Sequence, residues 1–373
     1  MGVAYAAGMK YGMALWGLGL VLNFSSSAAS KMELVQSVPL ETTLAVPGLR
    51  DAQEVWLEMI NGAKTTLDIE QFYISEQKGE ALTPVLDAIK AAGKRGVKVR
   101  LLVDSKFFKT YPESVNEIGA TPSCEARTVD FGDAVQHAKF FVVDGEVTFI
   151  GSQNFDWRAL SHIHEIGIRI EDKGLTSQLL SVFERDWNKG DFTKPTVASK
   201  GTKDPLFVSA PQPLNPAGIA YSLPEILSLI KGAKRTVRVE VMEYSTDKGH
   251  WKELDNALRA AAKRGVRVQI LVDESNLKKA KADMTALATV ENVELKAVTI
   301  PQFSGGAIAY ARLIHSKFLI ADDAKVWIGT ENWSESYFTK CRDVGVVTAD
   351  GEIVKNLSLV FERVWKSDYA ANL

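Results

Sequence analysis

The sequence predicts an α/β protein made of two copies of one structural unit. Short apolar, β-branched runs alternate with amphipathic stretches in both halves, and several segments of the first half recur in the second. The recurring segments are 61–69 with 231–239, 91–104 with 260–273, and 182–187 with 360–365. Alternation of strands and helices favours a sheet covered by helices on both faces.

The elements of each unit follow from hydrophobic periodicity. In the first unit we expect strands at 67–74, 97–103, 139–143 and 147–150, and helices at 81–94 and 176–187. Gly96 ends the first of these helices, because glycine readily adopts the left-handed conformation that follows a helix. In the second unit we expect helices at 223–231 and 252–263.

Length and charge limit the class of protein. A chain of 373 residues exceeds the usual size of one hydrophobic core, which predicts two domains. The net charge of −2 gives no general attraction to nucleic acid or anionic lipid, so a phosphate group must be bound by a local cluster of donors. The two cysteines, Cys124 and Cys341, are either free thiols or one disulfide, and their number and spacing do not suggest a metal site.

The N-terminal segment 1–30 has the pattern of an export signal. Lys10 precedes a mostly apolar run at 11–24, which is shorter than the roughly 20 residues of a membrane-spanning helix. Small residues at Ser27 and Ala29 fit a cleavage site. We therefore expect residues 1–30 to be a signal peptide or an uncleaved N-terminal anchor, and the protein to be periplasmic or secreted. The alternative is a buried core segment.

The two repeated domains are expected at 31–200 and 201–373. Residues 190–220 are rich in Pro, Gly, Lys and Thr and predict a surface linker. Equivalent residues are 169 positions apart at Asp104 and Asp273 but 178 apart at the histidines described next, so the second half carries an insertion between these points. The extra residues fall within 298–312, where a loop would border the site and help to select the substrate.

One motif, HxKxxxxD, occurs once in each half. Its residues are His137, Lys139 and Asp144 in the first half, and His315, Lys317 and Asp322 in the second. A glycine turn with an asparagine and then an acid follow each copy, namely Asn154 and Glu165, and Asn332 and Asp343. Every equivalent pair has the same separation along the chain, so the two copies form one repeated pattern that chance does not explain.

The residue types in this motif suit a phosphodiester. Histidine and lysine two positions apart on a strand point to the same face of the sheet. Lysine supplies a compact positive charge for a phosphate oxygen, and the asparagines add neutral donors. One histidine can attack phosphorus while the other protonates the leaving oxygen. Since each half holds one histidine, the halves must meet face to face, and no metal or cofactor is required.

Some candidate residues have a structural interpretation as well. An acid at the end of a strand often caps a turn, so structural and catalytic roles are equally expected for Asp144 and Asp322. Three other histidines, His162, His164 and His250, have no histidine counterpart in the other half. We expect them at the surface or behind the site rather than in catalysis.

The doubled motif with its GSxN and GTxN turns resembles the phospholipase D superfamily over essentially all of the chain after residue 30. Residues 137–170 and 312–348 look most like the branch that contains animal endolysosomal phospholipase D proteins and poxvirus envelope relatives. The resemblance implies two α/β/α sandwich domains related by a pseudo-twofold axis, with a metal-free site at their interface. It also implies that Glu165 orients His315 and that Asp343 orients His137. The animal branch acts on single-stranded nucleic acid from the 5′ end, but this sequence keeps Asp322 where that branch departs from the motif.

The predicted function is therefore a metal-independent phosphodiesterase that uses a phosphohistidine intermediate. Its substrate is either a phospholipid or a single-stranded nucleic acid. For nucleic acid, stacking of about 1–3 kcal/mol per base would replace the missing basic surface. For a phospholipid, the loop around Phe303 would contact the membrane surface. The alternatives are a phosphatidyl transferase similar to cardiolipin synthases, and a secreted binding protein without catalysis.

Overall fold

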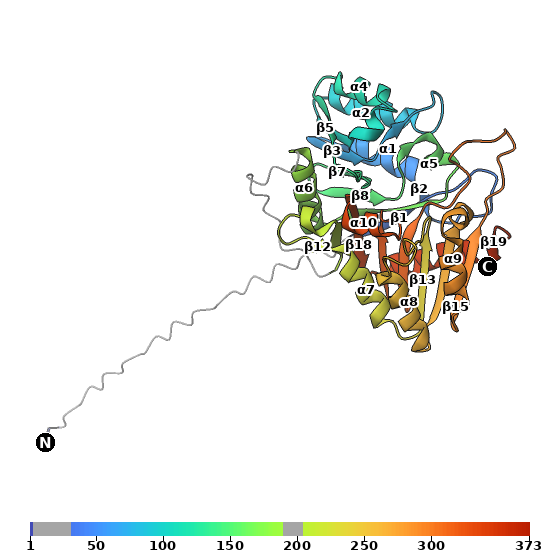
Figure 1. Cartoon of the computed structure of the whole chain (residues 1–373). Helices are drawn as coiled ribbons and strands as arrows, with labels where there is room; N and C mark the ends of the chain where they lie inside the picture. The colour runs from blue at the N-terminus through green and yellow to red at the C-terminus, as the bar shows by residue number, and fades with distance from the viewer. Residues whose placement is uncertain (3–30, 189–203) are drawn as a thin grey trace.

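The computed structural model describes residues 1–2, 31–188 and 204–373. The expected signal peptide or anchor at 1–30 lies almost entirely outside these ranges, and so does the expected domain boundary at residue 200. Within the described ranges, no helix is both long enough and apolar enough to cross a membrane. Figure 1 shows the first half of the chain, in blue and green, packed against the second half, in yellow and red.

An eight-stranded mixed sheet forms the centre of the first half, with the order β2-β1-β10-β8-β7-β3-β5-β6. Its strands are β1 Lys31–Ser37, β2 Arg50–Asp51, β3 Thr66–Gln71, β5 Lys98–Asp104, β6 Cys124–Val129, β7 Phe140–Val143, β8 Val147–Gly151 and β10 Glu165–Glu171. Strands β3, β5 and β6 pair in parallel, whereas β7, β8, β10 and β1 pair antiparallel in turn. The four strands expected from the sequence are confirmed as β3, β5, β7 and β8, with slightly shifted ends.

A nine-stranded sheet forms the centre of the second half, with the order β12-β11-β18-β17-β16-β13-β14-β15-β19. Its strands are β11 Leu206–Ala210, β12 Ala220–Tyr221, β13 Thr236–Val241, β14 Arg267–Asp273, β15 Val293–Val298, β16 Lys317–Ala321, β17 Lys325–Gly329, β18 Asp343–Thr348 and β19 Ala370–Asn372. Apart from β19, which is added at one edge, this order repeats that of the first sheet. The predicted repeated α/β fold is confirmed.

Strands β1 and β11 are equivalent, and the sequence analysis predicted neither. β1 pairs antiparallel with β10, and β11 pairs antiparallel with β18. The prediction that residues 190–220 form a surface linker is wrong for β11, in which Phe207 and Val208 are fully buried. Pro205 and Pro211 flank this short strand, and prolines so close together are typical of loops.

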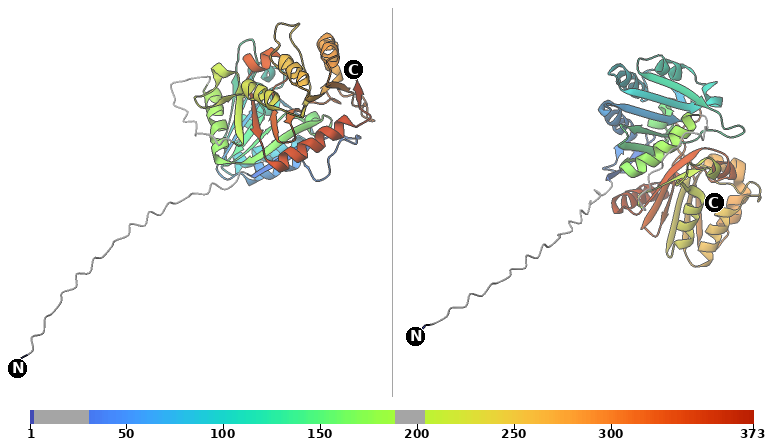
Figure 2. Two further views of the ribbon diagram at one scale, coloured as in Figure 1. Left: turned by 90° about the horizontal axis from the view of Figure 1, so that it is seen from below. Right: turned by 90° about the vertical axis from the view of Figure 1, so that its left-hand side faces the viewer.

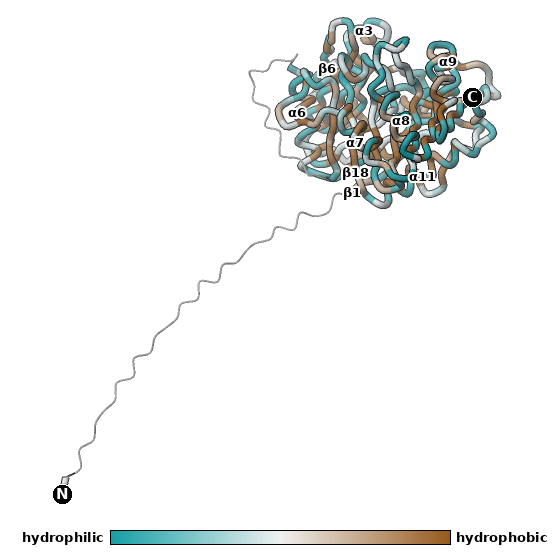
Figure 3. Tube along the Cα trace, turned by 60° about the horizontal axis from the view of Figure 1, so that its bottom comes forward, coloured by the Kyte–Doolittle hydropathy of each residue, from teal (hydrophilic) through white to brown (hydrophobic). Residues whose placement is uncertain are grey.

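Two sets of helices cover the outer faces of the sheets. They are α1 Ala52–Gly62, α2 Thr83–Lys94 and α4 Glu113–Gly119 on the first sheet, and α7 Ser222–Gly232, α8 Glu253–Lys263 and α9 Glu274–Ala288 on the second. Each set packs its apolar side on the sheet in a separate core. Helices α2, α7 and α8 confirm the predictions, while α1, α4 and α9 were not predicted. Figure 3 shows hydrophobic segments concentrated inside the molecule and hydrophilic ones over its outer turns.

The equivalent helices α6, at Lys173–Trp187, and α11, at Gly351–Trp365, join the two halves. Phe183 and Phe361 from these helices belong to one core that also includes the inner faces of both sheets. The predicted helix at 176–187 is confirmed as α6, which begins earlier, at Lys173, because the Asp172 side chain accepts an N–H of its first turn. The two α/β units therefore meet across a shared hydrophobic core (Figure 2).

Short elements lie around the junction between the halves. They are β4 Ile74–Ser75, β9 Phe155–Asp156, α3 Ser105–Phe108, α5 Trp157–Ser161, η1 Gln212–Leu214 and α10 Glu335–Thr339. Strands β4 and β9 pair in parallel as a small ribbon. These turns carry several of the aromatic side chains described below.

The extra residues of the second half lie in the loop from β15 to β16, as the spacing predicted, and this loop packs on the first half. The guanidinium of Arg312 donates to the carbonyl of Leu40 at 2.7 Å. Arg158 of the first half donates to the carbonyl of Ala309 at 3.2 Å. These hydrogen bonds attach the loop to the first half of the chain. The loop ends at β16, just after His315.

Candidate active site

The two motif histidines meet where the halves join. His137 lies just before β7, and His315 lies just before β16. The backbone N–H of His137 donates to the carbonyl of Arg342 at 2.8 Å, and that of His315 donates to the carbonyl of His164 at 2.8 Å. Each histidine is therefore fixed by the backbone of the opposite half, and neither half alone contains a complete site.

Each imidazole is oriented by an acid from the other half. Nδ1 of His137 lies 2.8 Å from Oδ1 of Asp343, and Nδ1 of His315 lies 2.9 Å from Oε2 of Glu165. These are the crossed pairs that the family resemblance implied. Because Nδ1 is engaged in both rings, Nε2 is the nitrogen left to attack phosphorus or to transfer a proton.

The motif lysines lie on the same segments as the histidines and are almost fully buried. The ammonium of Lys139 donates to the carbonyl of His137, and that of Lys317 donates to the carbonyl of His315. Burial lowers the pKa of each lysine to about 7. Both lysines are therefore charged below this pH, where they can bind an anionic oxygen, and lose that charge above it.

Burial also determines the charge of the histidines. It lowers the pKa of His137 well below its usual value, and the nearby charges of Lys139 and Lys317 lower it further. Burial lowers the pKa of His315 as well, but the Glu165 carboxylate acts against this effect. His137 is thus the ring favoured as a neutral nucleophile, and His315 is better suited to carry a proton.

The two orienting acids differ from each other. Burial alone would raise the pKa of Glu165, but the charges of His315 and Lys317 outweigh it and hold this pKa below its usual value. Burial raises the pKa of Asp343 well above its usual value, and the neighbouring carboxyl of Glu331 adds to the rise. The repeated motif therefore builds two electrostatically unequal histidine–acid pairs.

The two asparagines of the glycine turns are buried. The Oδ1 atoms of Asn154 and Asn332 have no hydrogen-bond partner among the described residues. The amide of Asn154 donates to the hydroxyl of Tyr73 at 3.5 Å, and Tyr337 lies against Asn332. Buried amide groups with unused hydrogen-bonding capacity are suited to a polar ligand.

Aromatic residues that the sequence analysis did not select surround His137. The ring of Tyr337, on α10, lies 4.9 Å from the imidazole, and that of Phe72 lies 5.1 Å from it on edge. Tyr73 and Phe107 pack beside Phe72. Their positions in short turns carry no periodic signal, so only the folded structure shows that they wall the site.

Buried polar pairs support the backbone segments that hold the histidines. Arg342 is completely buried and donates to Asp186 at 2.6 Å and to the carbonyl of Leu214 at 2.7 Å. Its equivalent in the first half of the repeat is His164, which lies 3.1 Å from Glu240. Arg342 was not predicted from the sequence, although its position next to Asp343 and its match with His164 were available as signals.

Of the two roles expected for Asp144 and Asp322, the structure favours the structural one. Asp144 accepts N–H groups of residues 64–66 at 2.7 to 3.2 Å, and Asp322 accepts those of residues 234–236 at 2.7 to 2.9 Å. Asp144 follows β7 and Asp322 follows β16, whereas the motif histidines come before these strands. Both therefore cap a backbone turn at the start of a neighbouring strand, which is the structural interpretation considered from the sequence.

Asp144→Asn is accordingly expected to lower stability without slowing the reaction. The variant keeps an acceptor but loses charge-assisted hydrogen bonds, so the free energy of unfolding should fall by about 1–2 kcal/mol. Denaturant unfolding and kcat/KM at a temperature well below the transition would check this, with Asp322→Asn as the matched variant. A large loss of kcat/KM with unchanged unfolding would restore a catalytic role for these acids.

The remaining sequence predictions concern thiols and histidines outside the motif. Cys124 and Cys341 are both free, so the disulfide alternative is wrong. His162 packs between Trp157 at 5.5 Å and Phe303 of the extra loop at 4.9 Å. Among the described residues, no group of three or more His, Cys, Asp or Glu side chains is arranged to hold a metal ion.

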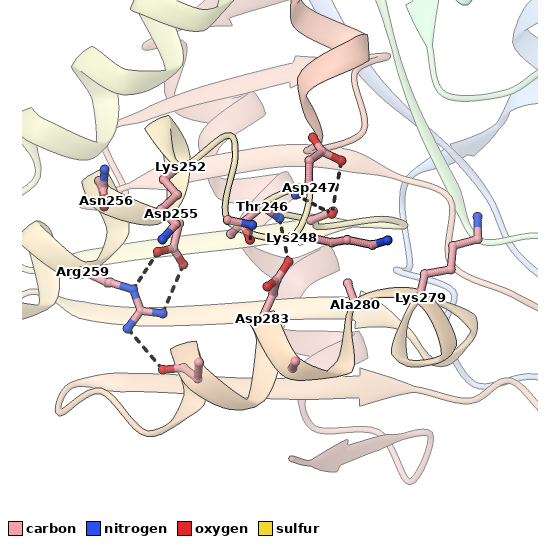
Figure 4. A pocket seen from close by; sticks show the side chains of 14 residues that line it. Thr246, Asp247, Lys248, Lys252, Asp255, Asn256, Arg259, Lys279, Ala280 and Asp283 are labelled. Carbon is pink, nitrogen blue, oxygen red and sulfur yellow. Dashed lines mark hydrogen bonds and ion pairs between the residues drawn. The ribbon is translucent and has the colours of Figure 1, made fainter.

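A cavity of about 840 Å³ lies beside this site in the second half, between α8, α9 and residues 245–252 (Figure 4). Thr246 donates its N–H to Asp283 at 2.8 Å across it, and Arg259 pairs with Asp255 at 2.7 Å. None of its lining residues belongs to the motif. One lining residue contacts the segment that follows Asn332: the N–H of Ser245 donates to the carbonyl of Trp333 at 2.8 Å.

Comparison with known proteins places the chain in one family. The model described as "Cardiolipin synthase, PLD-like domain" matches residues 56–187 and 226–365. The protein "5'-3' exonuclease PLD3" of Rattus norvegicus is 30% identical over 91% of this chain and 80% of its own length. "Phospholipase D Z" of Dictyostelium discoideum is 26% identical over 94% of this chain and 92% of its own length.

A solved structure shows the same fold at low sequence identity. The phosphatidylserine synthase of Haemophilus influenzae superimposes with a TM-score of 0.62 and 12% identity, covering 86% of this chain and 85% of that one. Both halves of the present chain match the family model, and each half contributes one complete motif. The chain therefore belongs to the phospholipase D-like family of enzymes.

Proposed function

We propose that the protein is a metal-independent phosphodiesterase that acts through a phosphohistidine on His137. The crossed pairing of the two histidines with acids of the opposite half is the observation that carries this proposal. It leaves both Nε2 atoms free, and the two motif lysines are close enough for their charges to act on both histidines. This set can bind a phosphodiester, attack it and protonate its leaving group with protein side chains alone.

The proposed reaction has two steps. Nε2 of neutral His137 attacks phosphorus, and the bond from phosphorus to the leaving oxygen breaks as His315 donates a proton to that oxygen. His315 then accepts a proton from water, whose oxygen attacks phosphorus and breaks the bond to His137. Lys139 and Lys317 stabilise the charge on the non-bridging oxygens in both steps. In a transferase, an alcohol would replace the water.

Two substrate classes have support. Single-stranded nucleic acid is favoured by the similarity to the protein named 5'-3' exonuclease over most of both chains. A phospholipid is favoured by the relatives named phospholipase D, and by two exposed apolar side chains near the extra loop. These are Leu40, 51% exposed, and Tyr310, 82% exposed, which the hydrogen bond from Arg312 to Leu40 brings to the same region.

The two classes are distinguished by product analysis in the presence of a chelator. The protein would be offered a single-stranded oligonucleotide with a 5′-hydroxyl and, in parallel, phosphatidylcholine vesicles with and without added ethanol. Mononucleotides released one at a time would identify a 5′ exonuclease, free choline a phospholipase, and phosphatidylethanol a transferase. Loss of all products with the chelator would contradict the metal-independent mechanism, and no product under any condition would favour a binding protein.

The buried lysines predict a rate optimum on the acid side of pH 7. The rate should fall as pH rises through about 7, because Lys139 and Lys317 then lose the charge that binds phosphate. It should also fall at low pH, when His137 becomes protonated and cannot attack. A profile of kcat/KM from pH 4 to 9 checks this. A rate that still rises between pH 7 and 9 would contradict the proposed role of the lysines.

We also propose that residues 1–30 direct export and that the two repeated domains occupy 31–200 and 201–373. Support comes from the apolar run at 11–24 and from the start of the first sheet at Lys31. Mass determination of the chain recovered from an expressing cell and its medium would show whether the segment is removed.

A further inference from the structure

Glu331 is a buried acid directly behind the active site, and the reaction proposed above does not use it. It follows Thr330 in the glycine turn of the second half and has no exposed surface. Its side chain folds back beneath Gly329, where a Cβ atom would lie 2.5 Å from its Oε2. The absence of a side chain at this glycine therefore creates the slot that holds the carboxyl.

The equivalent residue of the first half is neutral. Gln153 occupies the matching position of the repeat and folds back in the same way, with its Oε1 in the space left by Gly151 and Gly167. Its amide donates to Ser37 at 3.5 Å. The two slots thus have one shape but different chemistry, and only the slot behind the His137 pair contains an acid.

Hydrogen bonds indicate which of the two neighbouring carboxyl groups holds a proton. Oδ1 of Asp343 accepts from two donors, Nδ1 of His137 at 2.8 Å and the hydroxyl of Thr330 at 2.7 Å. Oε2 of Glu331 accepts one longer bond, from the N–H of Thr330 at 3.1 Å. Burial raises the pKa of both acids, so the two carboxyl groups share one negative charge. Donors favour the charged form of an acid, and the two short hydrogen bonds to Asp343 therefore place that charge on Asp343 rather than on Glu331.

The surroundings of Glu331 disfavour a second negative charge. Among the described residues no lysine or arginine forms an ion pair with it, and its Oε1, like Oδ2 of Asp343, has no hydrogen-bond partner. The titratable groups that face this region are Asp343 on β18, Lys139 before β7 and Tyr221 on β12. The hydroxyl of Ser222, at the start of α7, and the N–H groups of Thr330 and Glu331 favour the charged form, but burial has the larger effect. Burial raises the pKa of Glu331 to about 7.

We propose that Glu331 is a positioning residue that holds a proton behind the His137–Asp343 pair. When Glu331 is neutral, only one negative charge, that of Asp343, lies beside His137. The absence of a second negative charge helps His137 to stay unprotonated for attack, and it limits repulsion of the phosphodiester anion. The Gln153 slot is permanently neutral, so the His315–Glu165 pair does not change with pH in this way. The charge state of Glu331 does not depend on the proposed function. The effect of Glu331 on substrate binding does rest on the proposed function.

The charge state is tested by the stability of Glu331→Gln as a function of pH. An acid whose pKa is raised on folding stabilises the folded state below its unfolded pKa, and this contribution is lost as pH rises to the folded value. The variant, which mimics the protonated acid, should melt within about a degree of wild type at pH 5. Its advantage in melting temperature over wild type should grow up to about pH 7 and then stay level. A variant that is less stable than wild type at every pH would show that Glu331 is an anion.

Gln153→Glu is the matched control, because it puts an acid in the equivalent slot of the other half. Its melting temperature should fall relative to wild type as pH rises, in the opposite direction to that of Glu331→Gln. Equal behaviour of wild type and this variant at all pH values would mean that the slot does not disfavour a buried charge, which would remove the basis of the proposal.

The effect on the reaction is tested by the KM of an anionic phosphodiester, bis(4-nitrophenyl) phosphate, at pH 5.5 and 8.5. We expect KM of Glu331→Gln to be severalfold below that of wild type at pH 8.5, with a much smaller difference at pH 5.5. Since Glu331 also supports the charge of Lys139, an equal or higher KM at pH 8.5 would mean that its anion assists binding, and would overturn the proposal. Absence of any turnover by wild type would contradict the proposed function instead, and the melting experiment would still report the charge state.

Discussion

Replacing His137 with alanine should abolish turnover, with kcat lower by about 10⁶, the scale observed when a covalent nucleophile is removed from another hydrolase. Nε2 of His137 is presented by the 2.8 Å contact of Nδ1 with Asp343. Burial lowers the pKa of His315 too, but the Glu165 carboxylate opposes this effect, so we expect His315 to act as the proton donor and not to replace His137. The measurement is kcat with the substrate that product analysis identifies.

Acid-quenched protein would show directly whether His137 forms the intermediate. Wild type mixed briefly with excess substrate should carry a phosphoryl adduct on the peptide that contains His137, and His137→Ala should carry none. A folded variant is confirmed by a melting temperature close to that of wild type. An adduct on His315 would reverse the roles of the two rings, and near-normal turnover by both His137→Ala and His315→Ala would refute the mechanism.

His315→Ala should reduce kcat by about 10²–10⁴ for a natural substrate, whose leaving oxygen must be protonated. The loss should be much smaller for a 4-nitrophenyl ester, because nitrophenolate leaves without a proton. The ratio of the two losses is the measurement. Phosphoryl transfer to His137 should survive in this variant while hydrolysis of the adduct slows, since His315 also activates the water.

Glu165→Gln serves as the control for this result. It keeps the 2.9 Å contact with Nδ1 of His315 but removes the charge that favours a protonated ring. Glu165→Gln should also lose more kcat with a natural substrate than with a 4-nitrophenyl ester, but both losses should be smaller than those of His315→Ala. Equal losses for both classes of ester in His315→Ala would mean that the ring binds substrate rather than donating a proton.

The asymmetry between the halves follows from small sequence differences placed in equivalent positions. Glu165 and Asp343 occupy matching places, yet their pKa values shift in opposite directions. Burial dominates at Asp343 and raises its pKa, whereas the charges of His315 and Lys317 outweigh burial at Glu165 and lower its pKa. The repeat therefore supplies two similar frames, while individual side chains give the two histidines different tasks.

Several elements were predictable because their signals are local. Strands β3, β5, β7 and β8 and helices α2, α6, α7 and α8 each bury apolar side chains, and that burial imposes a pattern on the sequence. β11 was missed because a short strand between two prolines has no such pattern. The place of Asp144 and Asp322 in the motif left catalytic and structural roles equally expected, and only their contacts with backbone N–H groups at the other end of the strand favour the structural role.

The repeated α/β fold and the pair of HxK motifs were predictable from the chain alone, because residue type, spacing and repetition are properties of the sequence. The packing of Tyr337 and Phe72 around His137, and the place of Glu331 next to Asp343, are visible only in the folded protein. Contacts in this site join residues up to 206 positions apart, as His137 and Asp343 are. Their distances and burial, and with them the charge of each group, arise only when the two sheets pack against each other.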